Sequence, residues 1–459
     1  MDNAPLLDTD ETLCAARPVA NGIQGVKGWP RSSSFSTPKA GRLKVVAFSF
    51  ADQAFAVGST FLANVMLART QSKEEYGMFT LSYSVFTFLS ALHNSAILEP
   101  CTVYGSGRYR SRFSEYLRLM VRFNAFVGLL LTLTLLSVCL VLYFVAPHFV
   151  SRALLGMGAT VGVLLSGAFL RRIFYLQRQA VFAARASFIC FVTVVCGLWL
   201  ATRAQLLNGF SVFLILALGW IVAGVGLGKK LAVGNSEGSF LDSEPNYWRE
   251  HWKYSKWVFA TAFVFQFSTQ GYYWLVAYFL SVKQVAELRA MYMIIAPIDQ
   301  VFIALTFLVL PALATRYASG KMQDFLSFQR RYALGVLGTT ALFVLGVRLA
   351  GRPVMHLLYA GKFDDLAPLL YLLAFSPLVM GLGNSMNDAL KAVERPKIVF
   401  LAYVCSGVAT FIGGIPLVIH FGLPGAVYGV LLSGATYTTA MAVGFFLIVY
   451  RNAHRLDLP

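Results

Sequence analysis

The 459-residue sequence is poor in charge. Asp, Glu, Lys and Arg together make up 13% of it, where soluble domains carry about 25%. Hydrophobic residues make up 57%, and the mean hydropathy is +0.65. A chain of this composition has too few charges for a surface that faces water on all sides, so a water-soluble enzyme is excluded.

Residues that bind metals or nucleotides are also sparse. The six cysteines are scattered, with no C-x-x-C pair and no histidine at metal-ligand spacing. We therefore expect no disulfide framework, no metal site and no cofactor. The glycine-rich segment 105–108 lacks the G-x-x-x-x-G-K-[ST] pattern of a nucleotide-binding loop. A membrane enzyme such as a polysaccharide polymerase would need a sizeable loop outside the membrane to hold its catalytic groups. The longest connection expected on the outer side is only 351–366, so we expect no catalytic site there.

Long apolar runs dominate the sequence instead. Runs of about twenty residues recur from Val45 to Tyr450, and a helix of that length crosses the hydrocarbon core of a membrane. They predict an all-α polytopic membrane protein with about twelve transmembrane helices. The predicted spans are 45–67, 78–98, 123–146, 153–170, 179–201, 208–228, 257–281, 289–314, 332–350, 367–388, 397–420 and 424–450.

The positive charges predict the orientation of these spans. With the amino terminus in the cytoplasm, 28 of the 38 Lys and Arg residues are assigned to the cytoplasmic side, among them Arg171. Nine are assigned to the outer side, among them Arg289 and Arg348 at the ends of their spans, and Arg185 alone lies well within a span. This bias predicts that both termini are cytoplasmic. It also accounts for the net charge of +17 without a nucleic-acid partner, and it predicts attraction of the inner face to anionic membrane lipids. Residues 1–44 lack the apolar core of a secretion signal and are predicted to form a disordered cytoplasmic tail.

The chain contains an internal repeat. Ser59 and Tyr83 are 24 residues apart, as are Ser268 and Tyr292. Later landmarks recur in the same order, which predicts two six-helix lobes of the same orientation. The lobes are 45–228 and 257–450, with a cytoplasmic linker at 229–256 and a cytoplasmic tail at 451–459. Two such lobes can rock against each other around a central cavity, an arrangement typical of transporters.

Polar side chains recur on one face of four predicted spans. In the second span Tyr83, Ser90 and Asn94 follow one helical stripe, and in the eighth span Tyr292 and Asp299 are two turns apart. The first and seventh spans carry similar stripes. We predict that these faces line a substrate or ion cavity between the lobes. Its candidate residues are Asp52, Gln53, Thr60, Asn64, Tyr83, Ser90, Asn94, Arg122, Arg185, Gln266, Gln270, Tyr292 and Asp299.

Each candidate also has a plainer explanation. Hydroxyl and amide groups can serve only to join helices by hydrogen bonds. An ionised carboxylate deep in a membrane costs about 2.5–3.5 kcal/mol, which makes Asp52 and Asp299 candidates for coupling a proton or sodium ion to transport. Arg185 could contact an anion in the cavity or extend to the membrane surface. Arg122, at the entrance of the third span, could equally be a topological charge.

The segment Ala51–Phe79 resembles the first span and outer link of bacterial Wzx-type polysaccharide flippases. The match includes Leu-Ala-Arg at 67–69 and Glu-Tyr-Gly at 75–77. That family belongs to the multidrug/oligosaccharidyl-lipid/polysaccharide exporter (MOP) superfamily. The resemblance implies transport of a polyprenyl-diphosphate-linked oligosaccharide between the leaflets of the bacterial inner membrane. It also implies a cavity lined chiefly by the first two helices of each half.

Such a flippase would serve the synthesis of cell-surface or exported polysaccharide. Its expected partners are the lipid-linked oligosaccharide, membrane lipids, a polysaccharide polymerase and glycosyltransferases. The sequence departs from the cationic cavity expected of the family, because Arg185 is the single cation well within a predicted span and Arg122 lies at the rim. A second interpretation stays open: a cation-coupled small-molecule exporter of the same architecture, in which Asp52 and Asp299 bind a cationic substrate or its counter-ion.

Overall fold

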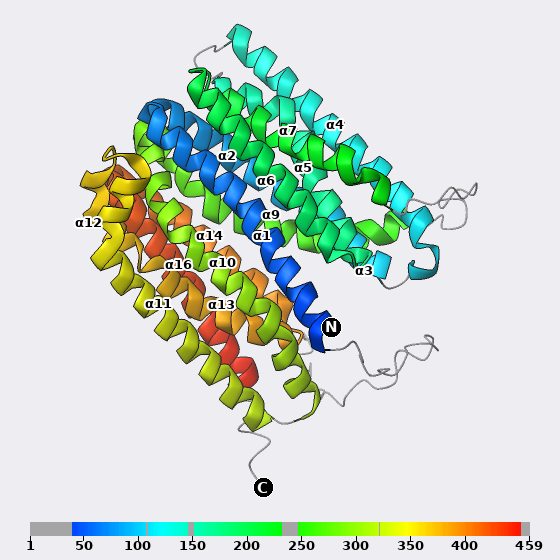
Figure 1. Ribbon diagram of the computed structural model, residues 1–459. Coiled ribbons are helices and arrows are strands. Elements are labelled where there is room, and N and C mark those ends of the chain that lie inside the picture. Colours follow the sequence, from blue (N-terminus) through cyan, green and yellow to red (C-terminus); the bar gives the residue numbers. More distant parts are fainter. Residues whose placement is uncertain (1–38, 107–108, 146–150, 232–246, 321, 451–459) are drawn as a thin grey trace, which may run out of the picture. The chain divides into compact units, whose positions relative to one another are not determined.

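The computed structural model describes residues 39–106, 109–145, 151–231, 247–320 and 322–450 (Figure 1). Within these ranges every regular element is a helix, and no strand occurs. The described residues from 47 to 450 belong to one compact unit. Most of the predicted tail at 1–44, the predicted tail at 451–459 and most of the predicted linker lie outside the described residues.

The first half of the chain forms helices over most of its described length. They are α1 (Lys39–Thr70), α2 (Lys73–His93), η1 (Asn94–Leu98), α3 (Glu99–Ser106), η2 (Arg110–Arg112), α4 (Phe113–Val145), α5 (Arg152–Leu176), α6 (Ala180–Arg203), α7 (Gly209–Leu227) and η4 (Gly228–Lys230). Helix α1 begins at Lys39, before the boundary predicted at residue 45.

The second half is also helical. Its elements are α9 (Tyr247–Phe279), α10 (Val282–Ala318), α11 (Met322–Tyr359), η5 (Asp364–Leu366), α12 (Ala367–Leu373), α13 (Ser376–Ala392), α14 (Pro396–Ile412), α15 (Gly414–Phe421), α16 (Leu423–Phe445) and η6 (Phe446–Tyr450). Helix α9 begins at Tyr247, inside the segment predicted to be a linker.

Each of the twelve predicted spans falls on a described helix or on consecutive helices. Nine helical segments of the described chain are long and apolar enough to cross a membrane; they lie at 113–145, 152–176, 180–203, 209–230, 282–318, 322–359, 364–392, 396–421 and 423–449. Helices α1, α2 and α9 are not among them, and these are three of the four helices to which the sequence assigned polar stripes. Twelve crossings and cytoplasmic termini therefore remain predictions.

Buried apolar side chains join the helices of each half. Helices α4, α5, α6 and α7 pack together in the first half, and α11, α13, α14 and α16 contact one another in the second (Figure 1). One buried cluster reaches across both halves. It contains Tyr76 and Phe79 from α2 together with Val285 and Met291 from α10. Helices α2 and α10 therefore form a joint between the halves.

The two joint helices begin in the same way. Ser72 precedes α2 and accepts a hydrogen bond from the backbone N–H of Glu75 at 3.2 Å. Ser281 precedes α10 and accepts one from the N–H of Gln284 at 3.3 Å. A serine at this position satisfies a backbone donor that the helix leaves unpaired. Ser72 and Ser281 are separated by the same interval as Ser59 and Ser268, so the sequence repeat has a structural counterpart at these helix starts.

Substituting Gly156 tests the close packing inside the first half. A Cβ at Gly156 in α5 would lie 2.8 Å from the Cα of Phe210 in α7. We expect Gly156→Ala to lower the free energy of unfolding by about 1–3 kcal/mol, because the two helices must move apart. Gly338→Ala is the matched control, since a Cβ there meets no atom within 4 Å. Unfolding of the detergent-solubilised protein measures both, and equal stability of Gly156→Ala and wild type would contradict this packing.

Candidate functional site

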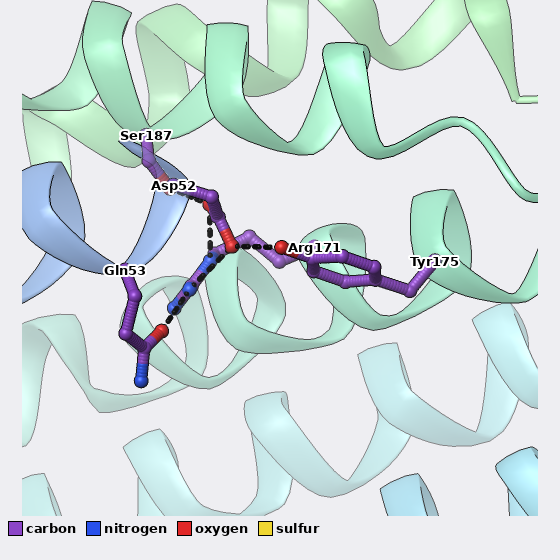
Figure 2. A network of polar contacts seen from close by, with 5 residues as sticks. All are labelled: Asp52, Gln53, Arg171, Tyr175 and Ser187. Atoms are coloured by element: carbon purple, nitrogen blue, oxygen red, sulfur yellow. Dashed lines mark hydrogen bonds and ion pairs between the residues drawn. The ribbon is translucent and has the colours of Figure 1, made fainter. Parts of the chain in front are cut away.

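Asp52 on α1 is the centre of a buried polar network. Its side chain is 1% exposed, and its carboxylate accepts two parallel hydrogen bonds from Arg171 of α5, at 2.9 Å from Nε and 2.7 Å from Nη2 (Figure 2). The hydroxyls of Tyr175 and Ser187 donate to the same carboxylate at 2.7 and 2.5 Å. A buried carboxylate with a bidentate arginine and two hydroxyl donors is fully paired.

This network gives Asp52 a structural partner that the sequence did not indicate. The sequence placed Asp52 on a cavity face and counted Arg171 as a cytoplasmic surface charge, whereas the two residues form an ion pair inside the first half. Gln53, which is exposed, extends the network outward, because its Oε1 accepts a hydrogen bond from Arg171 at 2.7 Å (Figure 2). No sequence spacing could reveal this pair, since Asp52 and Arg171 are 119 residues apart.

A second polar cluster lies between the two halves. Arg289 of α10 donates from Nε to Oδ1 of Asn64 on α1 at 3.1 Å. Its guanidinium also lies over the rings of Tyr83 on α2 and Tyr273 on α9, at 5.1 and 6.0 Å from their centroids. The four helices predicted to carry polar stripes thus meet around one cation. We call Asn64, Tyr83, Tyr273 and Arg289 the Arg289 cluster.

The sequence analysis missed Arg289. The apolar run of the eighth span starts at residue 289, so Arg289 was counted among the outer charges. Helix α10 starts at Val282, which places Arg289 two turns inside the helix. A cation close to the end of an apolar run, opposite aromatic residues, is the signal that could have found it.

Several other predicted residues lie near this cluster in the chain but bond locally. Thr60 donates to the carbonyl of Val57 in its own helix, and Gln270 donates to Gln266 at 3.5 Å. The ring of Tyr292 packs edge-on against Tyr273 at 6.0 Å. Thr60, Gln266, Gln270 and Tyr292 are all partly exposed, so their polar groups have a surface to face.

The remaining predicted residues separate into two groups. Asn94 belongs to the first half, where it accepts a hydrogen bond from Arg172 at 3.1 Å, and Ser90 is half-buried on α2. Arg122 on α4 and Arg185 on α6 are exposed. Arg185 lies over the ring of Phe182 on its own helix, at 5.5 Å. Among the described residues, neither of these two arginines contacts the Arg289 cluster, so the cation found between the halves at this cluster is Arg289.

Two carboxylates of the second half form no ion pair within the described part of the chain, although Lys391 lies near enough to Asp388 to act on it electrostatically. Asp388 on α13 is 1% exposed and accepts hydrogen bonds from the hydroxyls of Thr306 and Tyr332, at 3.0 and 3.1 Å. Asp299 on α10 is exposed. Both differ from Asp52, whose charge Arg171 balances. No group of three or more His, Cys, Asp or Glu side chains suited to a metal ion occurs in the described ranges.

The comparisons with known proteins agree on the fold. No family model matches the chain, and a search of curated proteins finds no relative. An inward-facing structure of a multidrug resistance MATE family transporter of the MOP superfamily matches with a TM-score of 0.74 at 12% identity, over 89% of this chain and 96% of that one. An outward-facing structure of the same description gives 0.66 at 12% identity, over 90% and 96%. The lipid II flippase MurJ, in an inward closed conformation, gives 0.65 at 14% identity, over 87% of each chain.

The chain has the fold of MOP superfamily transporters. This agrees with the superfamily fold implied by the resemblance in segment 51–79, and together with the apolar helices it identifies a multi-pass membrane protein. Likeness at this level of identity extends to the fold and not to the cargo. The Wzx-type assignment and the bacterial inner membrane therefore remain predictions.

The ion pair in the first half can be tested from both sides. We expect Asp52→Asn to lower the free energy of unfolding by about 3–5 kcal/mol, because it leaves the guanidinium of Arg171 without a counter-charge. The double variant Asp52→Asn/Arg171→Gln should lose less, since no uncompensated charge remains. Chemical unfolding in detergent measures both, and a single-variant loss no larger than that of the double variant would contradict the pairing.

Proposed function

We propose that this protein is an alternating-access transporter, not an enzyme, that flips a polyprenyl-diphosphate-linked oligosaccharide across the bacterial inner membrane. The product would feed the synthesis of cell-surface or exported polysaccharide, beside glycosyltransferases and a polymerase. The fold supports a transporter. The observation that carries the choice of cargo is Arg289, a cation placed between the two halves.

Arg289 has the chemistry that a diphosphate requires. It lies on neutral groups, namely the amide of Asn64 and the rings of Tyr83 and Tyr273. In the described part of the chain no carboxylate lies within ion-pairing distance of it. A guanidinium can hold two oxygens of one phosphate at once, and it keeps its charge at any physiological pH. An anionic cargo would supply the counter-charge that the protein does not.

The surrounding residues suit the rest of such a cargo. Sugars and phosphates cannot enter hydrocarbon without hydrogen-bond partners, because each unpaired polar group costs several kcal/mol. Amide and hydroxyl groups on four helices, among them Gln266, Gln270 and Thr60, could supply these partners. The polyprenyl chain would remain in the lipid during the crossing.

Flipping by variants at Arg289 tests this proposal. In liposomes holding a fluorescent lipid-linked oligosaccharide, leaflet exposure reports the flipping rate. We expect Arg289→Gln to lower that rate at least tenfold, because one charged hydrogen-bonding contact is worth about 1.5–3 kcal/mol. Arg348→Gln is the matched control. Arg348 also lies over a tyrosine ring, that of Tyr371 at 4.8 Å, but both belong to the second half. Unchanged flipping by Arg289→Gln would contradict the proposal.

A cation-coupled exporter of small molecules is the second candidate. The observation that favours it is Asp388, a buried carboxylate whose hydrogen-bond partners among the described residues are neutral hydroxyls and which forms no ion pair with the nearby Lys391. Such a carboxylate needs a proton or a cation. Asp299, exposed along α10, could receive a cationic cargo. Asp388 could equally couple a proton or sodium ion to flipping, so the carboxylate alone does not choose the cargo.

Ion dependence separates these possibilities. We expect Asp388→Asn to abolish the dependence of transport on a proton or sodium gradient in proteoliposomes. Asp324→Asn is the control, because Asp324 pairs with Arg316 at 3.3 Å and is 56% exposed. Export of a soluble cationic dye without flipping of the lipid-linked sugar would favour the exporter. Transport by Asp388→Asn with an unchanged gradient dependence would exclude Asp388 as the coupling site.

A further inference from the structure

Two reciprocal ion pairs connect the first turns of α2 and α10. Lys73 of α2 lies 2.6 Å from a carboxylate oxygen of Glu287 on α10. In the opposite sense, Lys283 of α10 lies 2.9 Å from Glu74 of α2. Each half therefore supplies one lysine and one glutamate. Because the helices occupy corresponding places in the repeat, these pairs tie the two halves together at one end.

Further contacts strengthen the same end. Arg69, in the last turn of α1, donates to the backbone carbonyl of Leu357 in the second half at 3.0 Å. Lys362 of the second half donates to the carbonyl of Gln71 at 2.8 Å. Here again each half donates one hydrogen bond to the other. These side chain to backbone hydrogen bonds can form only while the two halves are close together at this end.

The helices also touch through their backbones at Gly77. A Cβ at Gly77 would lie 2.1 Å from the carbonyl oxygen of Val282 and 2.7 Å from its Cγ1. No other residue type fits such a distance, since Cβ atoms do not approach an oxygen so closely. The present spacing of α2 and α10 therefore depends on glycine at this position.

Charges of both signs meet at this junction. The positive ends of α2 and α10 meet, and two helix N-termini repel each other unless acidic groups lie between them. Glu74 and Glu287 supply that negative charge. A neighbouring acid, Glu75, accepts a hydrogen bond from the N–H of Gly209 at the start of α7 at 2.7 Å. The pair of Lys283 and Glu74 is largely exposed, so it contributes little by itself and can break readily.

We infer that, in a transporter of the kind proposed above, this junction is a gate that closes one end of the predicted cavity and opens in each transport cycle. The gate consists of Lys73, Glu74, Gly77, Lys283 and Glu287, and we call it the α2–α10 lock. The Arg289 cluster lies within about two turns of the lock along α10, so opening the lock would uncover Arg289 from this end. The predicted topology assigns this end to the extracytoplasmic side. The lock does not depend on which cargo the protein carries.

Distance measurements between the halves test the lock. Spin labels at Leu206→Cys, in the loop before α7, and at Asp365→Cys, in η5, would report the separation of the halves at this end; both positions are exposed. Accessible native cysteines are replaced by serine. We expect Lys73→Glu to raise the long-distance population at least threefold, because it sets two glutamates against each other.

Charge exchange distinguishes the lock from a general loss of structure. The double variant Lys73→Glu/Glu287→Lys restores the pair in reverse and should return the distances to those of the wild type. Arg316→Glu breaks the pair with Asp324 inside the second half and should change nothing. Unchanged distances in Lys73→Glu, or a double variant as open as the single one, would overturn the lock.

Gly77→Val provides a second test. Its side chain cannot fit against Val282, so we expect the long-distance population to dominate. Gly346→Val is the control, because a Cβ there meets no atom within 4 Å. A closed distance at wild-type population in Gly77→Val would overturn the lock. Variants that open as expected in a protein that flips no lipid-linked sugar would keep the lock and reject the proposed cargo.

Discussion

A polar group in an apolar helix must find a partner or reach water, and this constraint organises the whole molecule. Asp52 satisfies this constraint by pairing with Arg171, Tyr175 and Ser187, all inside the first half. Arg289 satisfies it only with uncharged neighbours, so its positive charge has no counter-charge among them. The charge of Asp52 is therefore balanced inside the first half, whereas Arg289, between the halves, forms no ion pair among the described residues.

This difference suggests that the two halves have different roles in transport. The first half is held together by a buried ion pair and by close helix contacts such as that of Gly156 with Phe210. The second half carries Asp388, whose carboxylate accepts hydrogen bonds from two hydroxyls and forms no ion pair among the described residues, which makes it the candidate for binding a proton or sodium ion. The α2–α10 lock and the Arg289 cluster lie between them. In a cycle of this kind, binding of cargo and ion would open or close the contact between the halves. Neither half would need a large internal change.

The sequence predicted what local pattern determines and missed what lateral packing determines. Helix positions, and the polar stripes of the four helices that surround Arg289, follow from residue periodicity. The pairing of Asp52 with Arg171 does not, because nothing in the chain specifies which faces of α1 and α5 meet. Arg185 drew attention as the single cation inside a predicted span, yet it is exposed on α6. Arg289 was overlooked because α10 extends beyond its apolar run.

Reaction of introduced cysteines with a membrane-impermeant thiol reagent tests most directly whether water fills the space between the halves. We expect cysteines at Thr60, Ser90, Gln266 and Asp299 to react in membranes. Cysteines at Leu133 and Leu342, which are 54% and 70% exposed on apolar helices, should be shielded by lipid and stay unmodified. If the four polar positions reacted no faster than the two leucine positions, there would be no aqueous cavity, and the account would be wrong.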